Sequence, residues 1–90
     1  MEGTEGLKQR LVDNGYEDVV VFENYGYETA FIGVTNDNRA VYDYDLMVEY
    51  LMEKEGWSWE DAAEWIDYNT LRSLAYYGDG SPVVMYKLVD

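Results

Sequence analysis

Two adjacent helix signals in the middle of the chain limit its possible folds more than any other feature. Between residues 44 and 52 the apolar side chains recur at helical spacing, and Asp43 and Gly56 stand where an N-cap and a stop are expected. A second helix is predicted over residues 58–68, because it opens on an S-x-x-D capping signal. Its expected inward residues are Trp59, Ala62, Ala63 and Ile66. The middle of the chain is therefore predicted to form a helical hairpin.

Runs of β-branched and aromatic residues predict strands on both sides of this hairpin. The predicted strands are Val19–Phe22, Thr29–Val34, Ala40–Tyr42 and Val83–Leu88, and a further helix is expected over residues 5–14. Gly33 marks a possible bulge, and Asn36, Asp37 and Asn38 are typical of a turn. The expected fold class is α+β, in the order α-β-β-β-α-α-β. A small antiparallel sheet, made of a three-strand meander plus a C-terminal strand, would carry helices on one face.

The composition predicts one domain over residues 1–90, without the usual catalytic side chains. Hydrophobic residues make up 48% of the chain, which is enough for a real core. The sequence contains neither cysteine nor histidine. Disulfides, thiol catalysis and thiolate metal sites are therefore excluded, as are histidine bases and histidine metal ligands.

Sequence motifs for enzymes, nucleotides and metals are also missing. The chain has neither the G-x-x-x-x-G-K-[ST] nor the G-x-G-x-x-G pattern, and its serines have no histidine base. Asp43 and Asp45 form a D-x-D, but the rest of a calcium-binding loop does not follow. We therefore predict a non-enzymatic protein with no catalytic residue, no cofactor and no dedicated metal site.

The net charge of −13, from 19 acidic and 6 basic residues, narrows the class of partner. Such a surface repels phosphate backbones and anionic lipids, so direct binding to nucleic acid or to a membrane is not expected. It attracts a basic partner at long range. The alternative is that the charge serves solubility alone. The N-terminus lacks the pattern of a signal peptide and no apolar run is long enough to span a bilayer, so a cytoplasmic location is expected.

The acidic residues are concentrated in the predicted hairpin. Nine carboxylates fall between residues 43 and 67, and Lys54 alone offsets them. Glu49 and Glu53 lie one helical turn apart, as do Glu60 and Glu64, and like charges at this spacing destabilise a helix slightly. Four of the nine lie near helix N-termini, where the helix dipole favours anions, but five have no such local role. This excess favours a binding surface.

The predicted partner-binding carboxylates are Asp45, Glu49, Glu53, Glu55, Glu60, Glu64 and Asp67. Arg72 is an isolated cation in this region, and we expect it to pair with Asp67 or Glu64. Carboxylates spaced along a helix, with aromatic residues between them, can imitate a nucleic-acid strand for a protein that binds one.

Ten tyrosines in the chain give a second indication of a binding surface. Tyrosine offers a large contact area at a low entropic cost. Several lie beside predicted turns or element ends, where exposure is expected: Tyr25, Tyr27, Tyr42, Tyr44, Tyr76 and Tyr77. We assign Tyr25, Tyr27, Tyr76 and Tyr77 to the partner-binding surface. The alternative for each is that it covers a small core.

The C-terminal half resembles a known group of proteins. The resemblance is carried by the segments 43–51 (DYDLMVEYL), 55–58 (EGWS), 62–74 (AAEWIDYNTLRSL) and 82–86 (PVVMY). They are similar to short uncharacterised proteins of gut Firmicutes, their phages and mobile elements. The resemblance implies a phage or mobile-element setting and no site residues. In that setting, small acidic proteins often resemble anti-CRISPR inhibitors by size, charge and context.

These observations lead to one main hypothesis and one alternative. The main hypothesis is a monomeric, anti-CRISPR-like inhibitor that acts in a bacterial host cell. Its acidic surface would occupy the basic nucleic-acid-binding site of another protein, and a CRISPR effector is the specific expectation. The alternative is a structural or regulatory interaction module whose contacts come from the sheet and its tyrosines. A homodimer is one form that such a module could take.

Overall fold

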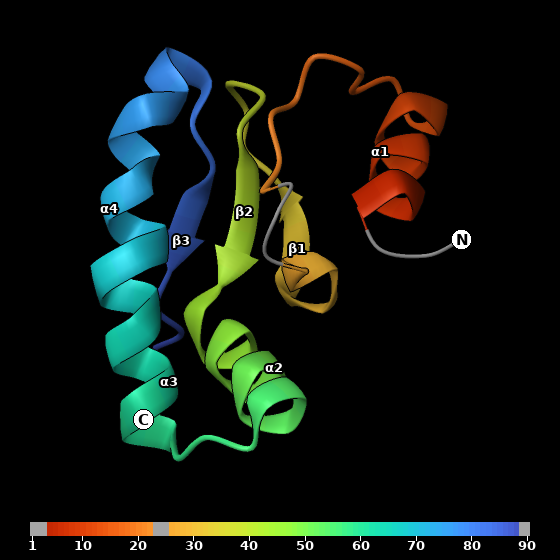
Figure 1. Ribbon diagram of the computed structural model, residues 1–90. Helices are drawn as coiled ribbons and strands as arrows, with labels where there is room; N and C mark the ends of the chain where they lie inside the picture. Colours follow the sequence, from red (N-terminus) through yellow and green to blue (C-terminus); the bar gives the residue numbers. More distant parts are fainter. Residues whose placement is uncertain (1–3, 23–25, 89–90) are drawn as a thin grey trace.

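The computed structural model describes residues 4–22 and 26–88 and shows an α+β fold on a three-stranded mixed sheet (Figure 1). The coarse fold class predicted from the sequence is thereby confirmed. The elements, in chain order, are α1 (Thr4–Asp13), the 3₁₀ helix η1 (Tyr27–Ala30), β1 (Phe31–Val34), β2 (Ala40–Asp43), α2 (Tyr44–Glu55), α3 (Trp59–Trp65), the π-helical turn η2 (Ile66–Thr70), α4 (Leu71–Ser73), the 3₁₀ segment η3 (Leu74–Gly80) and β3 (Val83–Met85).

Strands β1 and β2 form an antiparallel hairpin closed by a hydrogen-bonded turn. The Thr35 amide donates to the Arg39 carbonyl at 2.8 Å, and the Arg39 amide donates to Thr35 Oγ1 at 2.9 Å. Asn38 has a left-handed φ of 66°, which asparagine tolerates better than most residues. The register shifts between Phe31 and Gly33. The turn and the bulge expected from the sequence are both confirmed.

The remaining sheet topology differs from the predicted meander. β3 pairs in parallel with β2, with Tyr42 opposite Val84, so the strand order is β1-β2-β3. The predicted strand Val19–Phe22 is wrong, because this segment joins no strand of the described sheet. The side chains of Val21 and Phe22 still enter the core, and the Phe22 amide donates to the hydroxyl of Tyr42 at 3.3 Å. The Tyr42 hydroxyl thus accepts the hydrogen bond that the carbonyl of a neighbouring strand would accept in a sheet.

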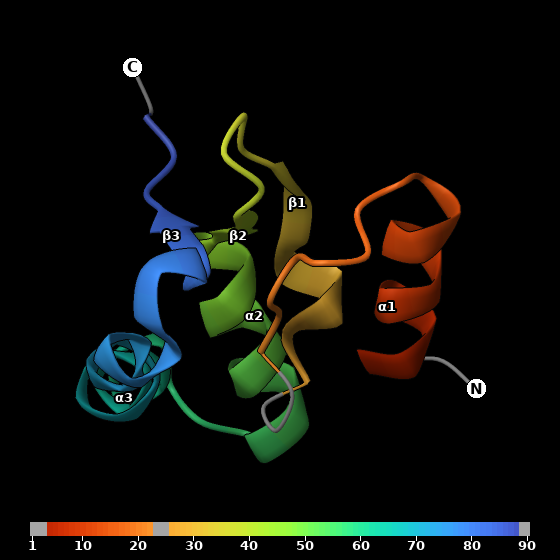
Figure 2. The ribbon, with the colours of Figure 1, turned by 90° about the horizontal axis from the view of Figure 1, so that it is seen from above.

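The long connection between β2 and β3 makes their parallel pairing possible. Two parallel neighbours need a crossover, and α2, α3 and the helical turns after α3 supply it. Figure 2 shows α2 and α3 on the same side of the three strands, while α1 lies beside β1. Arg39 fixes the end of the crossover, since its guanidinium donates to the carbonyl oxygen of Ser81 at 2.9 Å and to Ser81 Oγ at 3.1 Å.

Local capping determines where the two central helices begin and end. Asp43 Oδ1 accepts a hydrogen bond from the Leu46 amide at 3.2 Å, and Ser58 Oγ accepts one from the Asp61 amide at 3.2 Å. Gly56 ends α2 with φ 74°. All three signals were expected from the sequence, and all three are confirmed.

An aromatic cluster forms the centre of the core. The Phe22 ring lies 4.8 Å from the Tyr42 ring and 5.7 Å from the Tyr27 ring, measured between centroids. Tyr27 is fully buried, and its hydroxyl shares a 2.9 Å hydrogen bond with Thr70 Oγ1 in η2. Buried hydroxyls need such partners, and this one connects the start of the sheet to the crossover.

Candidate functional site

A nearly continuous helical run from residue 59 to residue 77 carries the exposed features of greatest interest. Its inward residues are Ala62, Ala63, Ile66 and Thr70, all of them buried. Its outward positions recur every four residues: Glu60, Glu64, Tyr68, Arg72 and Tyr76. We call Trp59, Glu60, Glu64, Asp67, Tyr68 and Tyr76 the acidic–aromatic face. Three large rings of this face are exposed, Trp59 by 48%, Tyr68 by 68% and Tyr76 by 91%.

The π-helical turn η2 lets one side of the run meet the core while the other stays in solvent. The Leu71 amide bonds the carbonyl of Ile66, five residues back, which widens the helix at this point. Asn69 Nδ2 donates to the carbonyl of Trp65 at 3.0 Å and so helps satisfy the widened turn. Thr70 then reaches Tyr27 in the core, while Tyr68 remains outside.

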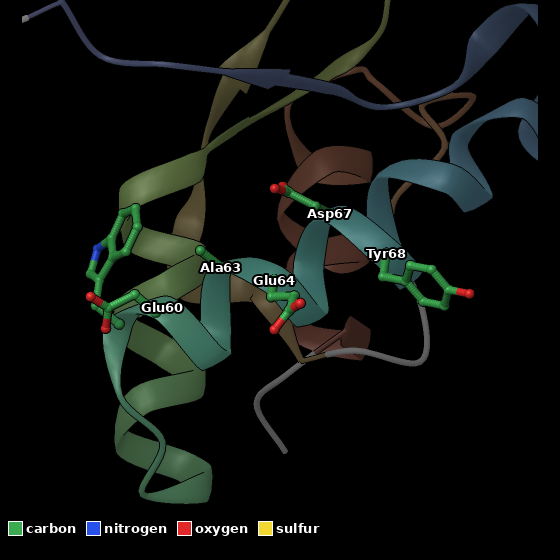
Figure 3. A pocket seen from close by; sticks show the side chains of 6 residues that line it. Glu60, Ala63, Glu64, Asp67 and Tyr68 are labelled. Atoms are coloured by element: carbon green, nitrogen blue, oxygen red, sulfur yellow. The ribbon is translucent and has the colours of Figure 1, made fainter.

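A shallow hollow of about 490 Å³ lies on the acidic–aromatic face, and Figure 3 shows its lining. The small side chain of Ala63 forms its floor, because Trp59 and Asp67 lie one helical turn to either side of it. Glu60, Glu64 and Tyr68 form the neighbouring ridge. We call this depression the Ala63 hollow. Its walls combine two aromatic rings with three carboxylates.

Asp67 is held in place by a tyrosine beneath the surface. The hydroxyl of Tyr44, which is buried at the start of α2, donates to Asp67 Oδ1 at 3.0 Å. Burial raises the pKa of Tyr44 above its ordinary value, and the hydrogen bond and charge of Asp67 raise it further. Tyr44 therefore remains a neutral donor, and Asp67 presents a fixed carboxylate to the hollow.

Tyr68 borders the Ala63 hollow and two further depressions along the same run. In the depression toward α4, the Arg72 guanidinium lies 4.7 Å from the centroid of the Tyr68 ring. Within residues 4–22 and 26–88, Arg72 does not form the expected ion pair with Asp67 or Glu64. At four-residue spacing the guanidinium stacks over the ring instead, an arrangement that cation–π attraction stabilises.

The structure brings together only some of the predicted carboxylates. Glu60, Glu64 and Asp67 line one hollow, and Asp45 and Asp67 both act on the hydroxyl of Tyr44. The other predicted carboxylates, Glu49, Glu53 and Glu55, are exposed on α2 and do not line the Ala63 hollow. Within residues 4–22 and 26–88, no three acidic side chains converge as a metal ion would require.

The tyrosine predictions need more correction. Tyr27, Tyr42 and Tyr44 are buried, so the expected exposure of these side chains is wrong. Tyr77 is partly buried, with its ring centroid 5.8 Å from that of Phe22. Each of these rings packs on core residues that are distant in sequence. Tyr76 is exposed as expected, and Tyr25 lies outside the described residues.

Sequence reasoning placed Trp59 wrongly and missed Tyr68. Trp59 was expected to point inward, but it follows the Ser58 cap directly and lies half-exposed on the outer side of α3. The signal that could have revealed Tyr68 is the four-residue ladder from Glu60 through Glu64 to Tyr68, which defines the outer ridge of the helix.

No family model matches the chain, and neither the curated proteins nor the solved structures contain a match to it. None of the helices in the described part of the chain has the length and apolar character that a membrane span requires.

Proposed function

We propose that this protein is a non-enzymatic inhibitor that binds another protein through its acidic–aromatic face and occupies a basic nucleic-acid-binding site there. One observation carries the proposal. Exposed carboxylates and exposed rings lie close together along one helical run, and the core uses none of the rings of Trp59, Tyr68 and Tyr76 for its packing.

This arrangement matches what a nucleic-acid groove recognises. Such grooves combine basic side chains, which neutralise phosphates, with surfaces on which bases stack. Four helical residues advance the chain by about 6 Å, so Glu60 and Glu64 place two negative charges one helical turn apart, and Asp67 adds a third beside them. The flat rings of Trp59 and Tyr68 lie beside these carboxylates, as bases lie beside phosphates.

The overall charge supports the same mode of action. A net charge of −13 attracts a basic groove at long range and accelerates the encounter. The resemblance to phage and mobile-element proteins suggests a bacterial host cell as the setting, and a CRISPR effector as the specific partner. The cytoplasm, where such effectors act, is then the place of action.

The alternative of a homodimer through the sheet would have to form without two of the tyrosines of that region. Tyr27 and Tyr42 are buried in the core of the same chain, so their rings are not free to make a second interface. The acidic–aromatic face also repels a second copy of itself.

The proposal can be tested by inhibition of target cleavage by purified RNA-guided effectors. The quadruple variant Glu49→Lys, Glu53→Lys, Glu60→Lys and Glu64→Lys should lose inhibition while circular dichroism shows an unchanged fold. Added guide RNA or target DNA should compete with the native protein, and binding should weaken steeply with salt. Inhibition that survives the four reversals, or that nucleic acid does not compete with, would refute the proposed function.

A further inference from the structure

The Ala63 hollow differs from a simple acidic patch, because it offers a flat cation two kinds of contact at once. Trp59 and Tyr68 supply ring surfaces, and Glu60, Glu64 and Asp67 supply acceptors around them. In Figure 3 the labelled side chains of Glu60, Glu64 and Tyr68 extend from successive turns of one helix. We propose that this hollow binds an arginine side chain of the partner protein, an inference that rests on the proposed function and specifies its chemistry.

The chain itself shows that a guanidinium binds Tyr68. Arg72 places its guanidinium 4.7 Å from the centroid of that ring, within the range of a cation–π contact. Arg72 lines the depression on the α4 side, whereas the Ala63 hollow on the α3 side contains no basic residue in its lining. An arginine from outside would repeat the Arg72 contact on the side of Tyr68 where the carboxylates lie.

One acceptor of the hollow is oriented in advance. Tyr44 donates to Oδ1 of Asp67, which holds this carboxylate in position without using its second oxygen. A guanidinium has five donors in a planar fork that suits carboxylate oxygens, and its plane stacks on aromatic rings. A lysine ammonium is a compact, strongly hydrated point charge and gains less from the same walls. The hollow should therefore discriminate between two partners of equal charge.

Charge complementarity identifies the source of the arginine. With 19 acidic and 6 basic residues, this chain disfavours a second copy of itself and favours a basic protein surface. Nucleic-acid-binding sites are rich in arginine, because its fork also fits phosphates.

Calorimetric titration with two capped peptides, hexa-arginine and hexalysine, tests this inference on the full chain. We expect hexa-arginine to bind about five-fold tighter, the factor that one partly exposed cation–π contact provides. Removing both rings of the hollow, by Trp59→Ala with Tyr68→Ala, should abolish most of that preference. Tyr76→Ala, which deletes an exposed ring of the same helical run outside the hollow, should preserve it. The rings of Trp59, Tyr68 and Tyr76 are all exposed, so these variants should retain the native circular dichroism spectrum.

A second pair of variants separates the hollow from general charge. Glu64→Gln and Glu53→Gln remove the same charge, but only Glu64 lines the hollow. Glu64→Gln should weaken hexa-arginine binding several-fold more than Glu53→Gln. Equal affinities of the two peptides, or an arginine preference that survives the loss of both Trp59 and Tyr68, would overturn the inference. If the native chain still inhibited the effector after such a result, the proposed function would stand without this inference. An arginine preference without inhibition would support the inference and contradict the proposed function.

Discussion

The Tyr44 hydroxyl donates a 3.0 Å hydrogen bond to Asp67, and so joins the first turn of α2 to the π-helical turn after α3. The same hydroxyl lies 3.4 Å from the carbonyl oxygen of Ala63, in the floor of the hollow. A buried side chain of one helix thus positions the exposed surface of another. Stability and surface geometry are coupled at this point.

Replacing Tyr44 by phenylalanine should lower the free energy of unfolding by about 1 kcal/mol, since the hydrogen bond to Asp67 is lost. Asp67→Asn is the matched control, because its side-chain oxygen can still accept from Tyr44, and it should cost clearly less. Urea unfolding measures both values. Equal costs for the two variants would show that the charge of Asp67, and not the hydrogen bond, determines its contribution.

Alkaline pH should weaken the fold through its buried tyrosines. Burial is the main cause that raises the pKa of Tyr42 from 10.0 to about 12, and the pKa of Tyr44 is raised as well. Above pH 10 the unfolded chain releases these protons while the folded chain keeps them, so stability falls as pH rises. The stabilising contribution of Tyr42 is complete below pH 10 and lost by about pH 12.

The slope of this decline can be measured. Each buried tyrosine should contribute up to about 1.4 kcal/mol per pH unit within this window. Urea unfolding between pH 8 and pH 11.5 should show a shallower decline for Tyr42→Phe than for the native chain. Identical slopes would contradict the assignment of Tyr42 as a hydroxyl that stays protonated in the fold.

Two glycines with similar backbone angles should differ in their tolerance of a side chain. Gly26 and Gly56 have φ values of 79° and 74°, which L residues rarely adopt. A Cβ at Gly26 would collide with the hydroxyl of Tyr50, whereas a Cβ at Gly56 would meet open space. Gly56→Ala should cost about 1 kcal/mol, from the backbone alone.

Gly26→Ala should cost at least about 1 kcal/mol more than Gly56→Ala, because Tyr50 must move out of a packed position. Thermal and urea unfolding of both variants provide the comparison. Adding Tyr50→Ala to Gly26→Ala should then relieve part of the excess cost. An equal effect of the two alanine variants would indicate that Tyr50 does not press on Gly26 in solution.

The features that the sequence predicted well are those that depend on neighbouring residues. The caps at Asp43 and Ser58, and the stop at Gly56, each involve a side chain or backbone angle within a few residues. The turn around Asn38 is equally local. For this reason the helical hairpin and the hairpin of β1 and β2 could be predicted from the sequence.

The features that the sequence did not reveal depend on distant partners. Val20 lies in a run with high β propensity, but strand formation needs a neighbouring ladder, and no described strand pairs with this run. The burial of Tyr27 depends on Thr70, 43 residues away, because the two hydroxyls share a hydrogen bond in the core. Parallel pairing of β3 likewise depends on the whole crossover.

The candidate site could be predicted only in part, because some of its features are local and others depend on distant contacts. The carboxylates of Glu60 and Glu64 follow from helical spacing, which is a local property. The exposure of Trp59 and Tyr68 depends on which side of the helix the sheet and α2 cover. The hollow at Ala63 exists only once that side has been chosen.

The most direct test of the proposed inhibitor compares two charge reversals of equal size on the two helices. Glu60→Lys with Glu64→Lys changes the acidic–aromatic face, and Glu49→Lys with Glu53→Lys changes the exposed side of α2. Inhibition of a purified RNA-guided effector should fall at least about ten-fold more for the α3 pair than for the α2 pair, a difference of about 1.4 kcal/mol in binding. Equal losses for the two pairs, or native inhibition by the α3 pair, would contradict the account.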